Sequence, residues 1–99
     1  MTTLPDQASA ETLGERLVQQ HLAACVTIGA PVTSLYHWQG ELQRDTERVV
    51  TIKTRQARFD ALREAIVALH PYELPEVIAV PITAGHPDYL AWIDTCTEI

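Results

Sequence analysis

The heptapeptide HPYELPE, residues His70–Glu76, lies between a helical pattern that ends near Leu69 and the apolar run Val77–Val80. Each of its two prolines fixes its own backbone angle φ and disfavours helix at the residue before it. The heptapeptide therefore predicts a stiff, non-helical connection between a helix and a strand. Because it carries an imidazole, a phenol and two carboxylates at fixed angles, it is also a candidate binding segment.

The residues before this connection give the strongest helical pattern of the chain. Phe59, Leu62, Ile66 and Leu69 recur at intervals of three and four residues, from a start near residue 57. This spacing places the four side chains on one face of a helix. It predicts an amphipathic helix that packs this face against a core and ends before the connection.

The residues after the connection predict a strand and a last helix. Val77–Ile82 is short and apolar, which is typical of a buried strand. A turn is expected at Ala84-Gly85, and the helix should begin near Pro87, because proline is favoured in a first helical turn. The apolar stripe of this helix comprises Tyr89, Trp92, Ile93 and Cys96.

The N-terminal region predicts another amphipathic helix. Asp6 is a suitable N-cap, because its carboxylate can accept a hydrogen bond from a backbone N–H of the first turn. The helix should extend to about Gln20. Its inner face comprises Ala10, Leu13 and Leu17.

Two long strands are predicted between these two helices, over about residues 24–39 and 41–54. β-Branched, apolar and aromatic residues dominate the first, and Val49–Thr54 is the clearest strand segment of the second. Gln39-Gly40 indicates the turn between them, and Pro31, which has no amide hydrogen, indicates a bulge. Because residues 43–48 are polar and charged, we expect the hairpin to project beyond one subunit.

The order of the elements predicts an α+β sandwich. Helix, strand, strand, helix, strand, helix becomes the ferredoxin-like βαββαβ order plus a C-terminal helix when a strand precedes the first helix. Only Met1–Leu4 precede Pro5, so this first strand should be short or missing. We expect residues 1–99 to form a single domain with one antiparallel sheet.

Composition and charge argue against several classes of partner. The net charge of −6 and the pI of about 5.0 argue against nucleic acid, and no apolar run is long enough to span a membrane. The first residues lack the basic and apolar regions of an export signal. Cys25 is expected to be a small core residue. Two widely spaced cysteines without a metal-binding pattern fit a reducing cytoplasm.

Several motifs in order give the chain a specific resemblance to one family. They are Leu22–Val26, Thr33–Gly40, Ile52–Thr54, His70–Glu76 and Ala84-Gly85 followed by Asp88–Trp92. In this order and at this spacing, the chain resembles the CutA divalent-cation-tolerance family from about residue 3 to residue 92. Because independent motifs agree, the resemblance is specific.

The resemblance implies a ferredoxin-like fold, a tight homotrimer built through the long hairpins, and a role in tolerance of divalent metals such as copper. It implies no enzymatic activity, and the sequence shows neither a Gly-rich phosphate loop nor a nucleophile elbow. Members of the family begin with a full strand that ends near the position of Thr2-Thr3. We therefore expect that Met1 is not the natural start, or that preceding residues are missing from this sequence.

A candidate metal ligand follows from the resemblance. In bacterial members, copper is placed on a cysteine at the end of the first strand and on a His-His pair before Pro-Tyr. These positions correspond to Thr2, Leu69 and His70, so only His70 keeps a metal-binding side chain. The candidate cofactor is Cu(II) or another divalent cation. Glu73, Glu76 or another subunit would have to complete such a site.

A ligand cleft and a subunit interface are the other candidate sites. Lys53 is expected in a cleft, where it would bind an anion or a carboxylate. The cleft residues would be Lys53, Tyr72, Glu73 and Glu76. Tyr36 and Trp38 are expected at the trimer interface, because aromatic residues anchor interfaces.

Two alternative functions stay open beside a trimeric metal-tolerance protein. One is a trimeric sensor, similar in plan to PII-like signalling proteins, that binds a small anionic ligand between subunits near Lys53, His70 and Tyr72. This reading is an analogy at the level of the fold. The other is a structural or adaptor trimer without a ligand.

Overall fold

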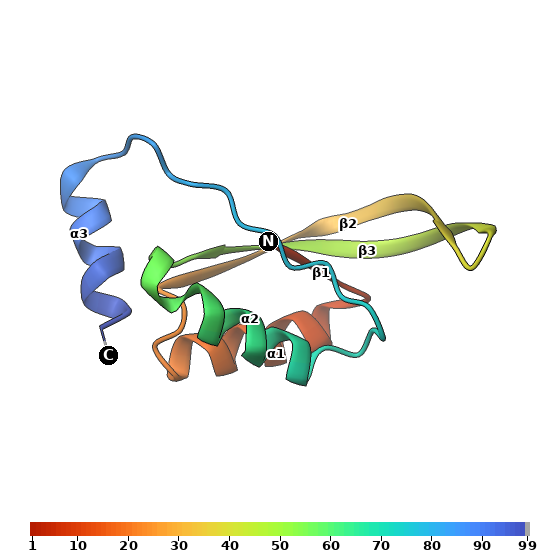
Figure 1. Cartoon of the computed structure of the whole chain (residues 1–99), viewed down its shortest axis with the longest axis horizontal. Coiled ribbons are helices and arrows are strands. Elements are labelled where there is room, and N and C mark those ends of the chain that lie inside the picture. Colours follow the sequence, from red (N-terminus) through yellow and green to blue (C-terminus); the bar gives the residue numbers. More distant parts are fainter. Residues whose placement is uncertain (99) are drawn as a thin grey trace.

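Two helices lie on one side of a three-stranded sheet in the computed structural model of the chain, which describes residues 1–98 (Figure 1). The elements are β1 (Thr2–Leu4), α1 (Gln7–Gln19), β2 (Cys25–Trp38), β3 (Glu41–Lys53), the short 3₁₀ helix η1 (Gln56–Arg58), α2 (Phe59–Leu69) and α3 (Pro87–Cys96). The α+β class is as predicted and the first strand is three residues long, but no strand lies between α2 and α3 in the described residues. None of the described helices is long and apolar enough to cross a membrane.

A long hairpin forms most of the sheet. The strand order is β1-β3-β2, and both pairs are antiparallel. The hairpin ladder continues to Trp38 opposite Glu41, and the turn holds Gln39 at φ 52° and Gly40 at φ 82°. Glycine adopts positive φ without a steric cost, which explains the turn at this point. The predicted hairpin is confirmed.

The hairpin changes register once, between Ile28 and Pro31. Pro31 has no N–H to donate to the ladder, so an interruption is expected at this position. Arg48 donates a hydrogen bond from Nη1 to the carbonyl of Gly29 at 3.1 Å. The predicted bulge is therefore confirmed. Since β1 ends opposite Arg48, the hairpin beyond the bulge has two strands only, and Figure 1 shows it as an arm that extends past α1 and α2.

The cap and inner face of α1 agree with the sequence prediction. The carboxylate of Asp6 accepts a hydrogen bond from the backbone N–H of Ser9 at 2.7 Å, and this bond holds the pKa of Asp6 below its ordinary value. Ala10, Leu13 and Leu17 are all buried. Local chemistry thus fixes where the helix begins, and tertiary packing uses the face that the periodicity predicts.

The core lies between the two helices and the sheet. It comprises Leu4, Ala10, Leu13, Leu17, Leu22, Ala23, Val50, Leu62 and Ile66. Leu62 and Ile66 are 4% and 1% exposed, which confirms the centre of the predicted α2 face. Phe59 is half-buried and Leu69 is exposed, so the packed part of the face is shorter than predicted.

The buried strand predicted over Val77–Ile82 is not formed. Its residues are extended and largely exposed, with Ile78 at 50% and Val80 at 74%. Met1 and Ile78 exchange two backbone hydrogen bonds, where the N-terminus meets this segment (Figure 1). One residue pair is too little for a strand, because strand pairing is stabilised by a ladder of several residues.

The last helix is held at its C-terminal end. The guanidinium of Arg55 donates two hydrogen bonds, from Nε and Nη2, to the carbonyl of Thr97 at 3.2 and 2.8 Å. Nδ1 of His21 lies 3.2 Å from the carbonyl oxygen of Cys96. These contacts fix the end of α3, while the extended segment that precedes it leads away from the helical layer (Figure 1).

Two packing predictions are wrong for the described chain. Tyr89 and Trp92 are 40% and 44% exposed, and of the predicted α3 stripe only Ile93 is buried. An apolar stripe is buried only where its helix docks, and α3 docks chiefly through its end. Cys25 is half-buried rather than a core residue, and its Sγ lies 3.8 Å from Oγ1 of Thr27.

The packing of α2 gives a first prediction. Ile66→Ala should lower the free energy of unfolding by about 2–5 kcal/mol, because it removes buried methyl groups and leaves a cavity. Val67→Ala is the matched control on the same helix, since Val67 is 53% exposed. It should change the free energy by less than about 0.5 kcal/mol. Urea unfolding at one protein concentration measures both, and similar values for the two variants would contradict the assigned core.

Candidate functional site

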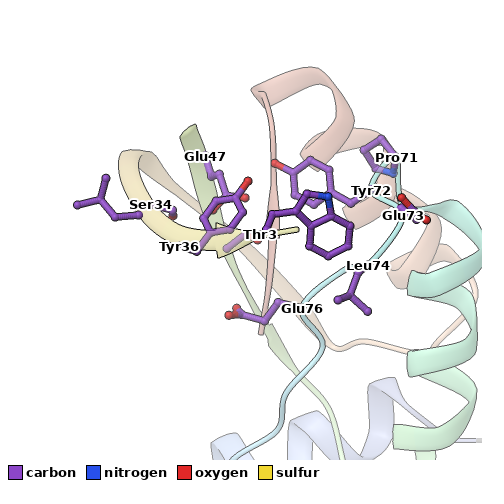
Figure 2. A pocket seen from close by; sticks show the side chains of 11 residues that line it. Thr3, Ser34, Tyr36, Glu47, Pro71, Tyr72, Glu73, Leu74 and Glu76 are labelled. Carbon is purple, nitrogen blue, oxygen red and sulfur yellow. The ribbon is translucent and has the colours of Figure 1, made fainter. Parts of the chain in front are cut away.

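An open pocket lies where the hairpin arm meets the segment that follows α2 (Figure 2). Its volume is about 680 Å³, which is within the range of small-molecule sites. The lining residues come from β1, the hairpin and the connection: Thr3, Ser34, Leu35, Tyr36, Trp38, Glu47, Pro71, Tyr72, Glu73, Leu74 and Glu76. We call it the aromatic–acidic pocket, because its polar character comes from carboxylates and its large rings from Tyr36, Trp38 and Tyr72.

A buried carboxylate lies at the hairpin side of the pocket. Glu47 is 7% exposed, although it is charged and lies on a strand of the arm. The phenol of Tyr72 is its hydrogen-bonding neighbour. Burial and then the Glu47 carboxylate raise the pKa of Tyr72 well above its ordinary value. The phenol therefore keeps its proton over the physiological range and donates it toward Glu47.

A second phenol–carboxylate pair lies beside the first. The hydroxyl of Tyr36 donates a hydrogen bond to Oδ2 of Asp45 across the hairpin. This bond is the main cause that raises the pKa of Tyr36. Asp45 and Glu47 lie two residues apart on β3, so their side chains share one face of the strand. Two tyrosines from separate parts of the chain are thus oriented by neighbouring carboxylates on that face.

His70 fixes the connection that forms the other wall of the pocket. Its Nε2 donates a hydrogen bond to the carbonyl of Thr3 at 2.7 Å, and its Nδ1 accepts one from the backbone N–H of Tyr72 at 3.0 Å. The rings of His70 and Tyr72 are tilted against each other, with centroids 4.7 Å apart. His70 is extended, at φ −76° and ψ 138°, as the following proline requires.

The fold brings together most of the predicted site residues. Tyr72, Glu73 and Glu76 line the aromatic–acidic pocket from the connection, and Tyr36 and Trp38 line it from the arm. Figure 2 shows the labelled side chains of the connection and of the arm around the same space. Apart from Lys53, the predicted cleft residues and the predicted interface residues therefore line one pocket.

Lys53 is not part of this pocket. It ends β3 opposite Cys25, whereas Thr3 of the pocket lies opposite Val49. Four residues along a strand correspond to roughly 13 Å. The predicted cleft of Lys53 with Tyr72, Glu73 and Glu76 is thus not assembled within one chain. No lysine, arginine or histidine is among the lining residues, so the pocket's charge argues against an anionic ligand.

Sequence reasoning missed Glu47 and Asp45. Both lie in the polar segment 43–48, whose composition predicted only that the hairpin projects. Their spacing of two residues is a usable signal, because it places both carboxylates on one face of a strand. The burial of Glu47 had no such signal, since its hydrogen-bonding neighbour Tyr72 is 25 residues further along the chain and reaches it only after folding.

The described residues do not present a preformed metal centre. Among residues 1–98, no group of three or more His, Cys, Asp and Glu side chains is arranged to hold an ion. In His70 both ring nitrogens already bind backbone groups, so a metal would have to replace one of these hydrogen bonds. Thr2, at the family's cysteine position, is fully buried, and its hydroxyl has no hydrogen-bond partner. Metal ligation by His70 stays a prediction.

The raised pKa of Tyr72 predicts a loss of stability at alkaline pH. In the unfolded chain the phenol loses its proton near pH 10, whereas the folded protein retains it to higher pH. The folded state then binds more protons, so the free energy of unfolding falls as the pH rises above about 10. Tyr72→Phe should show a shallower decline between about pH 9 and 11. Equal slopes for the two proteins in urea unfolding would contradict this assignment.

Comparison with known proteins agrees with the fold and the motifs. The family model described as CutA1 divalent ion tolerance protein matches residues 1–96. The divalent-cation tolerance protein CutA of Thermus thermophilus is 43% identical over 93 residues, which cover 94% of this chain and 90% of that protein. The CutA homolog of Xenopus laevis is 44% identical, and the match covers 92% of this chain but 60% of the relative.

Solved structures show the same architecture. The divalent cation tolerance protein of Thermus thermophilus superposes with a TM-score of 0.95 at 42% identity, over 98% of this chain and 94% of that chain. CutA from Xylella fastidiosa gives a TM-score of 0.95 at 44% identity, over 98% and 93% of the two chains. The chain belongs to the CutA1 divalent ion tolerance family.

Proposed function

We propose that this protein is a non-enzymatic homotrimer that acts in the tolerance of divalent cations such as copper in the cytoplasm. Membership of the family supports the role in cation tolerance. The exposed apolar surface of the hairpin arm supports self-association. The cysteines Cys25 and Cys96 are both free, which fits a reducing compartment.

The observation that carries the proposal is the exposure of large apolar side chains along the arm. Leu35 and Leu42 are 59% and 71% exposed, and Tyr36 and Trp38 are 40% and 36% exposed. A two-stranded arm is marginally stable alone, and aromatic residues are frequent anchors of protein interfaces. Neighbouring copies that cover the arm would remove this apolar surface from water and stabilise the arm.

The extended segment after the connection offers a second surface for neighbouring copies. Ile78, Val80 and Ile82 alternate along it and are 50%, 74% and 53% exposed. An extended apolar segment can add to a sheet edge of another chain through backbone hydrogen bonds. The same segment was predicted to be a buried strand, and a neighbour in the proposed trimer would supply the partner that such a strand needs.

Trp38→Ala should therefore weaken the trimer more than it weakens the folded chain. An aromatic anchor at the centre of an interface is worth about 2 kcal/mol or more, which corresponds to a change of roughly 30-fold in the association constant. Val18→Ala is the matched control, because Val18 is 41% exposed on α1, away from the arm. Sedimentation velocity over a dilution series measures the effect. Identical sedimentation of Trp38→Ala and wild type at every dilution would count against the interface.

His70 is the proposed ligand for an exchangeable divalent cation. The proposal rests on the family resemblance. Because both ring nitrogens of His70 already bond backbone groups, a cation must displace one of these hydrogen bonds. Freeing one ring nitrogen from Thr3 or Tyr72 sacrifices a bond worth about 1 kcal/mol. The affinity should then be roughly fivefold weaker than that of a free imidazole in the same surroundings. A cation held in this way is cargo that exchanges, not a resident cofactor.

Calorimetric titration with copper tests this assignment. Wild type should bind copper(II) saturably, and His70→Ala should abolish the binding, because the substitution removes the only imidazole of the connection. His86→Ala is the matched control, since His86 lies outside the pocket, before α3. Wild-type affinity in the His70→Ala variant would exclude His70 as the ligand. If no variant binds copper, a structural or adaptor trimer without a ligand becomes the better supported function.

A further inference from the structure

We propose that a groove on the helical layer binds a short peptide with free termini, its ammonium end at Asp6 and its carboxylate end at Arg16. The groove has a volume of about 400 Å³ and lies between α1 and the end of α2. We call it the α1 groove, and its lining residues include Asp6, Ser9, Leu13, Arg16, Leu69 and Pro71. The inference goes beyond the proposed role in cation tolerance.

The α1 groove lies away from the surfaces that the proposed trimer covers. Its lining residues belong to α1, to the cap of α1 and to the end of α2 with the proline that follows, and none of those described comes from the hairpin or from residues 77–82. The two helices lie on one side of the sheet, and the arm extends past them (Figure 1). One chain therefore forms the whole groove, which can stay open when neighbouring copies cover the arm.

One face of α1 supplies the floor of the groove and both of its charged ends. Asp6, Leu13 and Arg16 are spaced by seven and three residues, which places them along one side of a helix. α1 and α2 run in opposite directions, so the end of α2 lies beside the start of α1 (Figure 1). Leu69, which is 41% exposed, and Pro71 thus form the opposite wall. The middle of the groove is apolar, and its ends are polar.

The two ends of the groove carry opposite charges. Oδ1 of Asp6 accepts the backbone N–H of Ser9, which holds the pKa of this carboxyl below its ordinary value and leaves it ionised at neutral pH. Its other oxygen can accept a further hydrogen bond. Arg16 is exposed, and the one ion pair among residues 1–98 joins Arg63 to Asp60 instead. The groove thus offers a carboxylate for an ammonium group and a guanidinium for a carboxylate.

The helix dipoles do not reverse the charge at the Asp6 end. The start of α1 carries a partial positive charge, and the end of α2 beside it carries a partial negative charge, with no basic residue in its last turn. These two partial charges oppose each other, so the full charge of Asp6 sets the sign. Arg48 also lowers the pKa of Asp6, but its guanidinium bonds the carbonyl of Gly29. An ammonium group is therefore attracted to this end.

The distance between the charged ends sets the length of the ligand. Arg16 lies ten residues after Asp6. Ten residues correspond to roughly 15 Å along a helix. Long side chains on a helix point toward its N-terminus, so the guanidinium of Arg16 shortens this gap. An extended tripeptide spans at most roughly 11 Å. A single amino acid carries its two charges too close together to contact both ends, whereas a tripeptide fits the gap and places its middle side chain against Leu69.

Four forms of the peptide Ala-Leu-Ala test the proposal: with free termini, acetylated, amidated, and blocked at both ends. NMR titration of the isotope-labelled full chain should show saturable binding of the free peptide at millimolar concentrations. Each block should weaken binding about threefold, because it removes one exposed charge pair. Equal affinity of the free and the doubly blocked peptide would show a merely apolar groove and overturn the proposal. Absence of saturation with the free peptide would overturn it as well.

Two variants assign the ends of the bound peptide. Asp6→Asn removes the charge but keeps the N-cap, because asparagine caps helices about as well as aspartate. It should weaken binding of the free peptide about threefold and leave that of the acetylated peptide unchanged. Arg16→Gln should weaken binding of the free peptide to a similar extent and leave that of the amidated peptide unchanged.

Glu15→Gln is the matched control, because Glu15 is exposed on α1 and does not line the groove. It should bind the free peptide like wild type. Unchanged affinity for the free peptide in both Asp6→Asn and Arg16→Gln would refute the site. A loss that does not depend on which terminus is blocked would contradict the assigned ends.

Two further measurements separate this proposal from the proposed function. Asp6→Asn and Arg16→Gln should retain the copper binding and the sedimentation of the wild type, since neither residue lies on the arm. Trp38→Ala, which should weaken the trimer, should bind the free peptide within about twofold of wild type, because the two sites share no residue. Loss of peptide binding in a folded Trp38→Ala variant would contradict a groove that one chain completes. Peptide binding by a wild type that binds no copper would support the groove while the proposed copper site fails.

Discussion

One imidazole connects the two parts of the chain that form the pocket. His70 bonds the carbonyl of Thr3, 67 residues earlier, and the N–H of Tyr72, two residues later. The first bond ties the end of α2 to β1, and the second fixes the path of the chain through Pro71. Tyr72 lies two residues after His70, and its phenol reaches Glu47 on the hairpin. His70 therefore links the connection, which forms one wall of the pocket, to the first strand of the sheet.

The buried carboxylate of Glu47 is tolerated for the same reason. An isolated charge in a poorly hydrated place costs several kcal/mol, roughly, unless a donor compensates it. The phenol of Tyr72 is the donor beside this carboxylate, and burial and the carboxylate both raise the pKa of the phenol. Such a pair contributes little net stability, since two groups lose water to form it. Its consequence is positional: the ring of Tyr72 and the charge of Glu47 are fixed next to each other.

The sequence predicted the elements whose causes are local. The cap of Asp6, the turn at Gln39-Gly40 and the bulge at Pro31 each depend on a few neighbouring residues, and each occurs as expected. The strand over residues 77–82 failed because pairing depends on a partner that no local pattern specifies. One part of the site could be predicted, because the composition of the connection pointed to it. The burial of Glu47 could not be predicted, because it depends on Tyr72, which lies 25 residues further along the chain. Lys53 lies apart from Tyr72 within one chain, because strand position as well as residue type decides which side chains meet, and a cleft between subunits stays a prediction.

Charge and assembly oppose each other at the arm. In the proposed trimer, covering the apolar side chains of Leu35 and Leu42 favours association, yet each added copy carries a net charge of −6. Asp45 and Glu47 lie on the arm, where a water-poor interface would screen their charge weakly. Cations at these carboxylates would lower the repulsion, so cation binding and association should favour each other by linkage. In the proposed trimer, the same carboxylates would then attract cations and, once a cation is bound, repel neighbouring copies less.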